Sequence, residues 1–347
     1  MVWAWINQQL TLPILKVKKG KVMTGEYLLN KGIVCASYRW LWLCLSLTTF
    51  TSHAEQQSFK QLKLADATEY SYDWQDSNAQ AHSLKFLLPA AQHNQPLQRK
   101  FVANMAQQYV YIELHKAARA IDPRQATVDI KRQGKNIQVE VSSRSQELAN
   151  RWQKNMEKSQ TQAFDRYLHE HYFTRFTSFM GEEAVKPDHL RYIDENKIPL
   201  LPVAQSIYDM LPSGSESRSY VNLLLSWVQS IPYNSLENRL TSNGAGYLPP
   251  LAVINNNQGD CDSKAVLMAS LIRSLLPEVK MVMVYLPNHA VLGISLPFRT
   301  NEPIVRLDGT DYLLMETSGP AIMAIGETGE KTKLALARGR YIFESIP

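Results

Sequence analysis

The chain has 347 residues, of which 45% are hydrophobic and 20% are charged, a composition typical of a globular protein that excludes a disordered chain. Its length allows one large domain or two modest ones. Six of the 37 basic residues but only one of the 32 acidic residues lie in residues 1–54, so the rest of the chain carries 31 of each. This balance indicates no basic surface for nucleic acid.

Residues 1–54 are typical of a targeting segment. Two basic residues precede an eleven-residue apolar run at 40–50, and small Ser52 and Ala54 follow it at the spacing of a signal-peptidase site. The run is shorter than the roughly 20 residues that a membrane-spanning helix needs. The pattern predicts export to the periplasm or the cell exterior, with cleavage after Ala54. An uncleaved membrane anchor is the alternative.

The three cysteines are Cys35, Cys44 and Cys261, and the first two lie in the targeting segment. An exported and processed chain would therefore keep Cys261 alone and form no intramolecular disulfide. An unpaired thiol is a liability in an oxidising compartment, because it oxidises or couples to other thiols. The cysteine pattern therefore marks Cys261 as a candidate reactive residue.

Residues 55–200 show mixed patterns that predict an accessory α+β domain of unknown type. In chain order, the predicted elements are a strand at 82–90, a helix at 98–121, a hairpin at 126–143 and a helix at 145–173. Residues 181–197 are charged and are predicted to form a solvated connector. A domain boundary is expected between Lys186 and Pro202, where charges mix with prolines.

His169 and His171 do not form a metal motif. They are two residues apart and so face different sides of a helix. No histidine follows His169 by four residues, as the zinc motif HExxH would require. Both are predicted to lie at the surface, and the sequence shows no metal-ligand cluster or cofactor motif.

Residues 201–347 predict a second unit, with a helix at 219–233 and a second helix that begins at Cys261. Strands follow at 280–287 and 289–297, and a hairpin turns at Asp308-Gly309, a strong hairpin signal. A helix followed by three or more antiparallel strands predicts an α+β fold with the cysteine helix packed on a sheet.

Cys261 stands at the start of its helix, directly after a cluster of turn-forming residues at 255–260. The helix dipole at such a position favours the thiolate form of a cysteine. Activated thiol chemistry also needs a base and a group that orients the base. His289 opens a strand 28 residues later, and Glu316 ends a strand after another 27. Those two strands are expected to lie side by side or one strand apart.

Three segments resemble motifs of the transglutaminase-like superfamily, whose fold is related to papain. They are QGDCDSKAVLMASLIR, NHAVLGI and DGTDYLLMETS, and SWVQSIPY resembles the helix that precedes the nucleophile in bacterial members. The resemblance covers residues 215–320. It implies that Cys261 is the nucleophile, His289 the general base and Glu316 the acid of a catalytic triad.

The acid is where the sequence departs from the family, which mostly has Asp in that place. The extra methylene of Glu316 moves its carboxylate by more than an ångström, and catalysis is sensitive to such shifts. Asp308 and Asp311 are the rivals, although the hairpin turn already explains Asp308. In the manner of papain relatives, the resemblance also implies Gln229 as an oxyanion-hole donor beside the Cys261 backbone N–H.

Two classes of function follow. The first is an exported thiol-dependent hydrolase or acyl transferase that acts on amide bonds of protein or peptide substrates through a thioester, without metal or cofactor. The second is a non-catalytic transglutaminase-like binding or scaffold protein of the cell envelope. A cell-envelope partner that binds through residues 55–200 fits either class. The sequence leaves open the substrate, the choice between hydrolysis and transamidation, and the oligomeric state.

Overall fold

The structure is a computed structural model that describes residues 56–347 except 91–96, 135, 241, 243 and 320. This part of the chain is α+β, as the sequence predicts, with eight helices and four antiparallel sheets. The predicted targeting segment, with its cleavage site after Ala54 and both of its cysteines, lies outside the described residues. Within them, no helix is long and apolar enough to cross a membrane.

The largest sheet has five antiparallel strands, all from the C-terminal part of the chain. In spatial order they are β10 (Ile304–Leu307), β11 (Thr310–Met315), β9 (His289–Ile294), β8 (Met281–Leu286) and β12 (Ile342–Ile346). Its two faces belong to two apolar clusters, one shared with α7 (Cys261–Leu275) and the other with α8 (Glu330–Ala337). Because both faces are covered, β8 and β9 are nearly continuous apolar runs.

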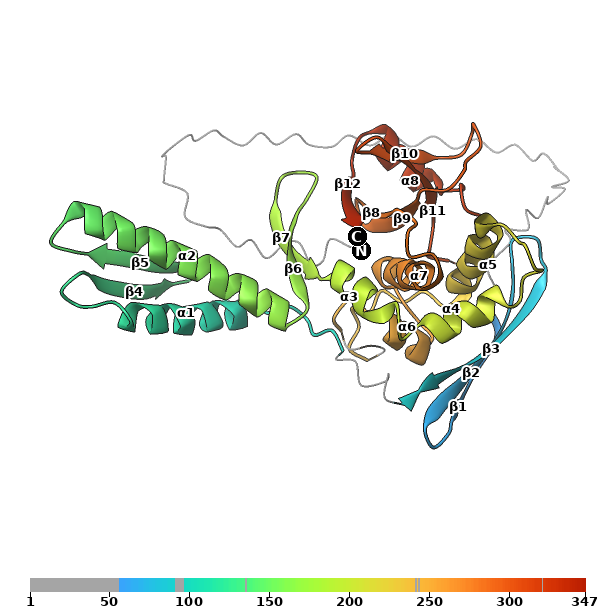
Figure 1. Cartoon of the computed structure of the whole chain (residues 1–347), viewed down its shortest axis with the longest axis horizontal. Helices are drawn as coiled ribbons and strands as arrows, with labels where there is room; N and C mark the ends of the chain where they lie inside the picture. The colour runs from blue at the N-terminus through green and yellow to red at the C-terminus, as the bar shows by residue number, and fades with distance from the viewer. Residues whose placement is uncertain (1–55, 91–96, 135, 241, 243, 320) are drawn as a thin grey trace, which may run out of the picture.

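The helix that begins at Cys261 is the centre of the larger core. Twelve of the fifteen residues of α7 are buried. Four other helices contact it, namely α3 (His189–Asn196), α4 (Leu201–Tyr208), α5 (Ser217–Ser230) and α6 (Pro250–Asn256). The helix is therefore buried on nearly all sides, its polar residues Lys264 and Arg273 included, and lies between the five-stranded sheet and the other helices (Figure 1).

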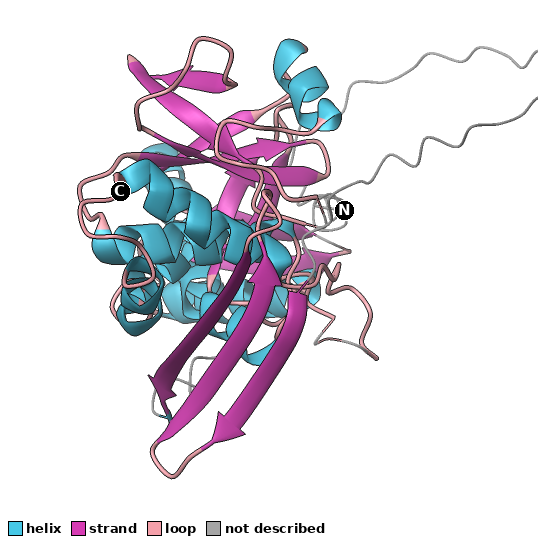
Figure 2. Cartoon of the chain, turned by 90° about the vertical axis from the view of Figure 1, so that its right-hand side faces the viewer, coloured by secondary structure: helices cyan, strands magenta, loops and turns pink. Residues whose placement is uncertain are grey.

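A three-stranded sheet from the N-terminal part packs against the same core. Its strands, in order, are β1 (Gln56–Lys63), β2 (Ala67–Gln75) and β3 (Ala81–Pro89). Figure 2 shows them as three long neighbouring strands beside the helices. Tyr72 meets Trp227 of α5 edge to face, with ring centroids 5.3 Å apart, and Trp74 Nε1 donates to Ser226 Oγ at 3.0 Å.

The packing therefore does not follow the predicted division at residue 200. Inward-facing residues of β2 and β3 join one apolar cluster with α5 and α7, so the strands that open the predicted accessory domain belong to the main body. Their alternating pattern marks a strand with one buried face, but it does not reveal which element covers that face.

A smaller unit projects from the body as an arm (Figure 1). It contains α1 (Ala103–Arg119), β4 (Thr127–Gln133), β5 (Asn136–Ser142) and α2 (Gln146–Glu170). The two helices cover one face of the β4–β5 hairpin and enclose a separate apolar cluster. Both predicted helices and the predicted hairpin are confirmed, and the elements 103–170 are called the arm below.

The predicted solvated connector at 181–197 is wrong. These residues form β7 (Glu183–Pro187), which pairs with β6 (Phe173–Thr177), and then α3. Lys186 and His189 are both buried. Their polar partners are Glu344 and Tyr285, about 100 to 160 residues later in the chain, so the local charge pattern gave no sign of this burial.

Candidate active site

The position of Cys261 is set by the turn that precedes α7. Asp260 caps the helix, because its side chain accepts a hydrogen bond from the Ser263 N–H at 3.0 Å. Gly259 is tied to the end of the α5 segment, where its N–H donates to the Pro232 carbonyl at 3.2 Å. Cys261 is a free thiol and is 5% exposed. It is the first residue of the helix, as predicted.

His289 is the first residue of β9 and lies opposite Leu286 of β8. The two-residue turn between these strands ends at Asn288, whose left-handed φ of 60° is a conformation that asparagine tolerates. The turn brings the imidazole to the N-terminus of α7. There Cys261 lies near the imidazole and contributes to its raised pKa, and His289 Nε2 lies 2.5 Å from Glu316 Oε2.

Glu316 directly follows β11, which pairs with β9 without an intervening strand. The acid strand and the histidine strand are thus immediate neighbours, which decides between the two arrangements that the sequence left open. Asp308 lies at the opposite end of β11, in the exposed turn, and Asp311 pairs with Arg306 at 3.1 Å. Neither rival carboxylate has a contact with His289.

The neighbouring side chains change the pKa values of His289 and Glu316. Burial alone would lower the pKa of His289, but the hydrogen bond with Glu316 and the interactions with the Cys261 and Glu316 charges raise it to about 10. Burial alone would raise the pKa of Glu316, but its hydrogen bond with His289 and the imidazole charge lower it. The surroundings therefore favour an imidazolium beside an ionised Glu316.

The structure does not place Gln229 as an oxyanion-hole donor. Its Nε2 donates to the backbone carbonyls of Glu316 at 2.7 Å and Met323 at 2.9 Å, and its Oε1 accepts from the Met323 N–H at 3.3 Å. The side chain is 1% exposed. Both amide hydrogens are used, so Gln229 instead fastens the loop that follows Glu316.

Tyr233 is a site residue that sequence reasoning missed. Its side chain lies near Cys261 and interacts with it electrostatically. Burial and the charges of Cys261 and Asp260 raise the pKa of Tyr233 to about 12, so the phenol keeps its proton. The ring is nearly half exposed. A single tyrosine after Ile231-Pro232 carries no sequence signal that separates it from a surface residue.

Lys264 connects the nucleophile helix to the segment that carries Tyr233. Its side chain is fully buried, and its Nζ donates to the backbone carbonyls of Gln229 and Ile231 at the end of α5. Burial lowers the pKa of Lys264 to about 7. A lysine three residues into α7 thus supplies a cap for the carbonyl end of a neighbouring helix.

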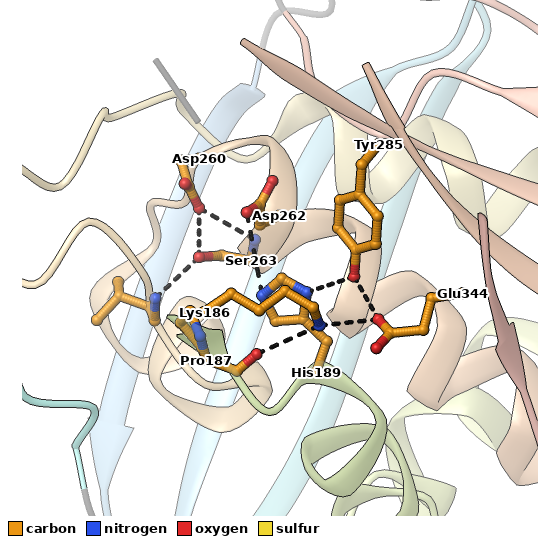
Figure 3. Close-up of polar contacts among 9 residues, drawn as sticks. Lys186, Pro187, His189, Asp260, Asp262, Ser263, Tyr285 and Glu344 are labelled. Atoms are coloured by element: carbon orange, nitrogen blue, oxygen red, sulfur yellow. Dashed lines mark hydrogen bonds and ion pairs between the residues drawn. The ribbon is translucent and has the colours of Figure 1, made fainter. Parts of the chain in front are cut away.

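A chain of buried and half-buried polar groups lies against the first turn of α7 (Figure 3). The Asp262 carboxylate lies 4.0 Å from His189 Nε2, and His189 Nδ1 lies 2.8 Å from the Tyr285 hydroxyl. Tyr285 donates to Glu344 at 2.6 Å, and Lys186 also donates to Glu344 at 2.8 Å. The chain links α7 to β7, α3, β8 and β12.

Burial dominates the ionisation of this chain. It lowers the pKa of His189, with a further contribution from the charge of Lys186, so this imidazole is neutral. Burial also raises the pKa of Asp262 to about 6, which the charges of Lys186 and His289 partly oppose. His189 was predicted to lie in a solvated connector, and only the folded chain shows its place behind the nucleophile.

Among the described residues, no group of three or more His, Cys, Asp or Glu side chains is arranged to hold a metal ion. Comparisons with models of protein families, with curated proteins and with solved structures found no match. The function is therefore argued from the geometry and chemistry of these residues.

Proposed function

We propose that this protein is an exported thiol-dependent hydrolase or acyl transferase with a transglutaminase-like, papain-related catalytic fold, acting on amide bonds of protein or peptide substrates. The observation that carries the proposal is the line of three side chains Cys261, His289 and Glu316. They come from a helix start, a strand start and the end of the neighbouring strand. A nucleophile, a base and a group that orients the base are the parts that covalent thiol catalysis requires.

In the proposed reaction, the Cys261 sulfur attacks the carbonyl carbon of an amide. His289 takes up the thiol proton and passes it to the nitrogen of the departing amine, so that the C–N bond breaks and a thioester remains. Water then cleaves the thioester in hydrolysis, and a second amine does so in acyl transfer. Because Glu316 holds Nε2, the other ring nitrogen, Nδ1, is the one that serves the thiol.

Two donors are proposed for the oxyanion of the tetrahedral intermediate. As the first residue of α7, Cys261 has a backbone N–H without an intrahelical acceptor. The Tyr233 side chain lies near Cys261, and its hydroxyl keeps its proton. Donors at this position act where negative charge develops, and the loss of one such donor commonly costs about 10²–10³-fold in rate.

The proposal is tested by alkylation of Cys261 across pH 5–9 with iodoacetamide. The wild-type thiol is expected to react rapidly near pH 6, where an ordinary thiol is almost unreactive. His289→Ala should remove that reactivity at low pH. Substrates would then be captured from envelope extracts with the Cys261→Ala variant, which binds but cannot form the thioester. A wild-type protein that reacts only as an ordinary or buried thiol would contradict the proposal.

The arm supports a second reading, a binding or scaffold protein of the cell envelope. It has its own apolar cluster and contributes none of the three site residues. In that reading the Cys261 side chain would have no special reactivity, and variants of the arm rather than of the site would lose the partner. The same alkylation experiment separates the two readings.

A further inference from the structure

The two carboxylate oxygens of Glu316 have separate partners. Oε2 faces His289, while Oε1 accepts hydrogen bonds from the Thr332 hydroxyl at 2.5 Å and from the Gly329 N–H at 3.2 Å. Gly329 is the N-cap of α8, and Thr332 lies in the first turn of that helix. The first turn of α8 thus fixes one oxygen and leaves the other aimed at the imidazole.

We propose that Thr332 is a positioning residue of the active site, which orients Glu316 toward His289 and so allows a glutamate to act as the third member of the triad. The inference rests on the proposed function and extends it to a residue outside the sequence motifs. Thr332 contacts neither the thiol nor the imidazole, and its effect passes through Glu316.

The length of the glutamate side chain explains why such a residue is needed. Glu has one more rotatable bond than Asp, so a single orientation costs more conformational entropy and is less well defined. Glu316 is 6% exposed and Thr332 is 2% exposed. Water is therefore poorly placed to replace the hydroxyl, and a carboxylate that loses a buried donor is no longer held in one orientation.

The backbone of Glu316 is fixed separately. Its carbonyl accepts the hydrogen bond from Gln229 Nε2, and the same side chain binds both backbone groups of Met323. The following loop also passes very close to α5: a Cβ atom at Gly319 would lie 2.5 Å from the Gln229 carbonyl oxygen. The main chain of Glu316 is thus held by α5, and its side chain is held by α8.

The chain offers a matched control for a test. Thr328 is also a buried threonine of this segment, and its hydroxyl has no hydrogen-bond partner. Thr328→Val therefore removes a buried hydroxyl without touching Glu316, whereas Thr332→Val removes the donor to Oε1. Thr332→Ser keeps the hydroxyl and loses only the methyl group, and Thr332→Ala loses both.

Two measurements on the full chain read the effect, the NMR titration of the His289 ring and the pH profile of Cys261 alkylation. Thr332→Val is expected to lower the pKa of His289 by about one, because a less well oriented carboxylate stabilises the imidazolium less. Alkylation near pH 6 should fall about tenfold as a consequence. Thr332→Ser should restore both values, and Thr328→Val should match the wild type.

If Thr332→Val and Thr328→Val give the same His289 titration, the positioning role is wrong even where Cys261 proves reactive. If Thr332→Val does not fold, Thr332→Ser and Thr332→Ala are compared instead. Equal His289 titrations in these two variants would also show that the positioning role is wrong. A wild-type thiol without unusual reactivity would instead contradict the proposed function. The His289 titration would still report on Thr332 in that case, so the two failures are distinguishable.

Discussion

The nucleophile helix and the long helix of the arm show two ways in which a helix is used in one chain. Twelve of the fifteen residues of α7 are buried, but only four of the twenty-five residues of α2 are. The position of α7 is fixed by packing on nearly every side, so its first turn has little freedom to move. α2 packs through one side, which carries its four buried residues, and its remaining residues contact solvent. Chemistry is expected where the packing is complete, and tolerance to substitution where it is not.

The largest difference in reaction rate is expected between variants of two histidines, one in the site and one in the arm. His289→Ala should reduce thiol-dependent turnover by about 10²–10⁴-fold, because the proton acceptor of Cys261 is lost. His169→Ala, at an exposed position of α2, should leave the rate unchanged. Initial rates with a substrate captured by the Cys261→Ala variant would measure both. A comparable loss for His169→Ala would show that the arm takes part in catalysis.

The second difference concerns stability. Leu267→Ala in the middle of α7 should cost about 2–5 kcal/mol of unfolding free energy, because a fully buried side chain leaves a cavity in a core that cannot collapse. Met156→Ala in α2 should loosen the arm while the body stays folded, since Met156 belongs to the arm's own cluster. Chemical denaturation measures the first variant, and hydrogen exchange resolved along the chain measures the second. Loss of protection in α7 caused by Met156→Ala would contradict the independence of the two units.

The sequence predicted the elements whose signals are local. The helix beginning at Cys261, the strand beginning at His289 and the turn at Asp308-Gly309 are all confirmed at those residues. Helical spacing, a turn cluster and an Asp-Gly pair are each contained in a window of some fifteen residues. From the chain order, the strand that ends at Glu316 was expected to lie beside the strand that begins at His289 or one strand away from it.

What the sequence could not predict depends on partners that are distant along the chain. Lys186 and His189 read as parts of a solvated connector because the groups that satisfy them lie on β8 and β12. Thr332 was missed because an isolated threonine has no pattern, and its role depends on the place where α8 starts relative to Glu316. Gln229 was assigned a role by resemblance, but its actual acceptors are backbone carbonyls that only the fold brings within reach.

A smaller difference in stability is expected between a buried ionised pair, His289 and Glu316, and an exposed one. The pKa of His289 is raised to about 10, so its contribution to stability is complete below its ordinary pKa of about 6.5 and is lost as pH rises toward 10. The pKa of Glu316 is lowered, so its contribution is present above its ordinary value and is lost in acid. Glu316→Gln should therefore cost most between about pH 4.5 and 6.5, by about 1.5–3 kcal/mol, and less toward pH 10.

The exposed counterpart is Asp165 of α2, which pairs with Arg175 at 2.7 Å. Both side chains are more than one third exposed, so Asp165→Asn should cost at most about 1 kcal/mol, and less in high salt. Denaturation curves recorded from pH 4 to 10 measure both variants. A cost for Glu316→Gln that does not change between pH 6 and 10 would show that the carboxylate and the imidazole are not coupled as the geometry indicates.

The smallest effect is expected within the body itself, at the far end of the acid strand. Asp308 and Gly309 both have left-handed φ angles, 49° and 76°, the backbone of a type I′ turn in which asparagine is at least as well suited as aspartate. Asp308→Asn should therefore change the free energy of unfolding by less than about 0.5 kcal/mol, and Cys261 alkylation should keep its wild-type pH profile. A thermal melt and the alkylation profile, recorded beside Glu316→Gln, make the comparison direct. Since Asp308 and Glu316 stand at opposite ends of one six-residue strand, only one of them can reach His289. A large loss of thiol reactivity in Asp308→Asn with none in Glu316→Gln would mean that the acid role belongs to the turn, and that β11 lies in the opposite direction along β9.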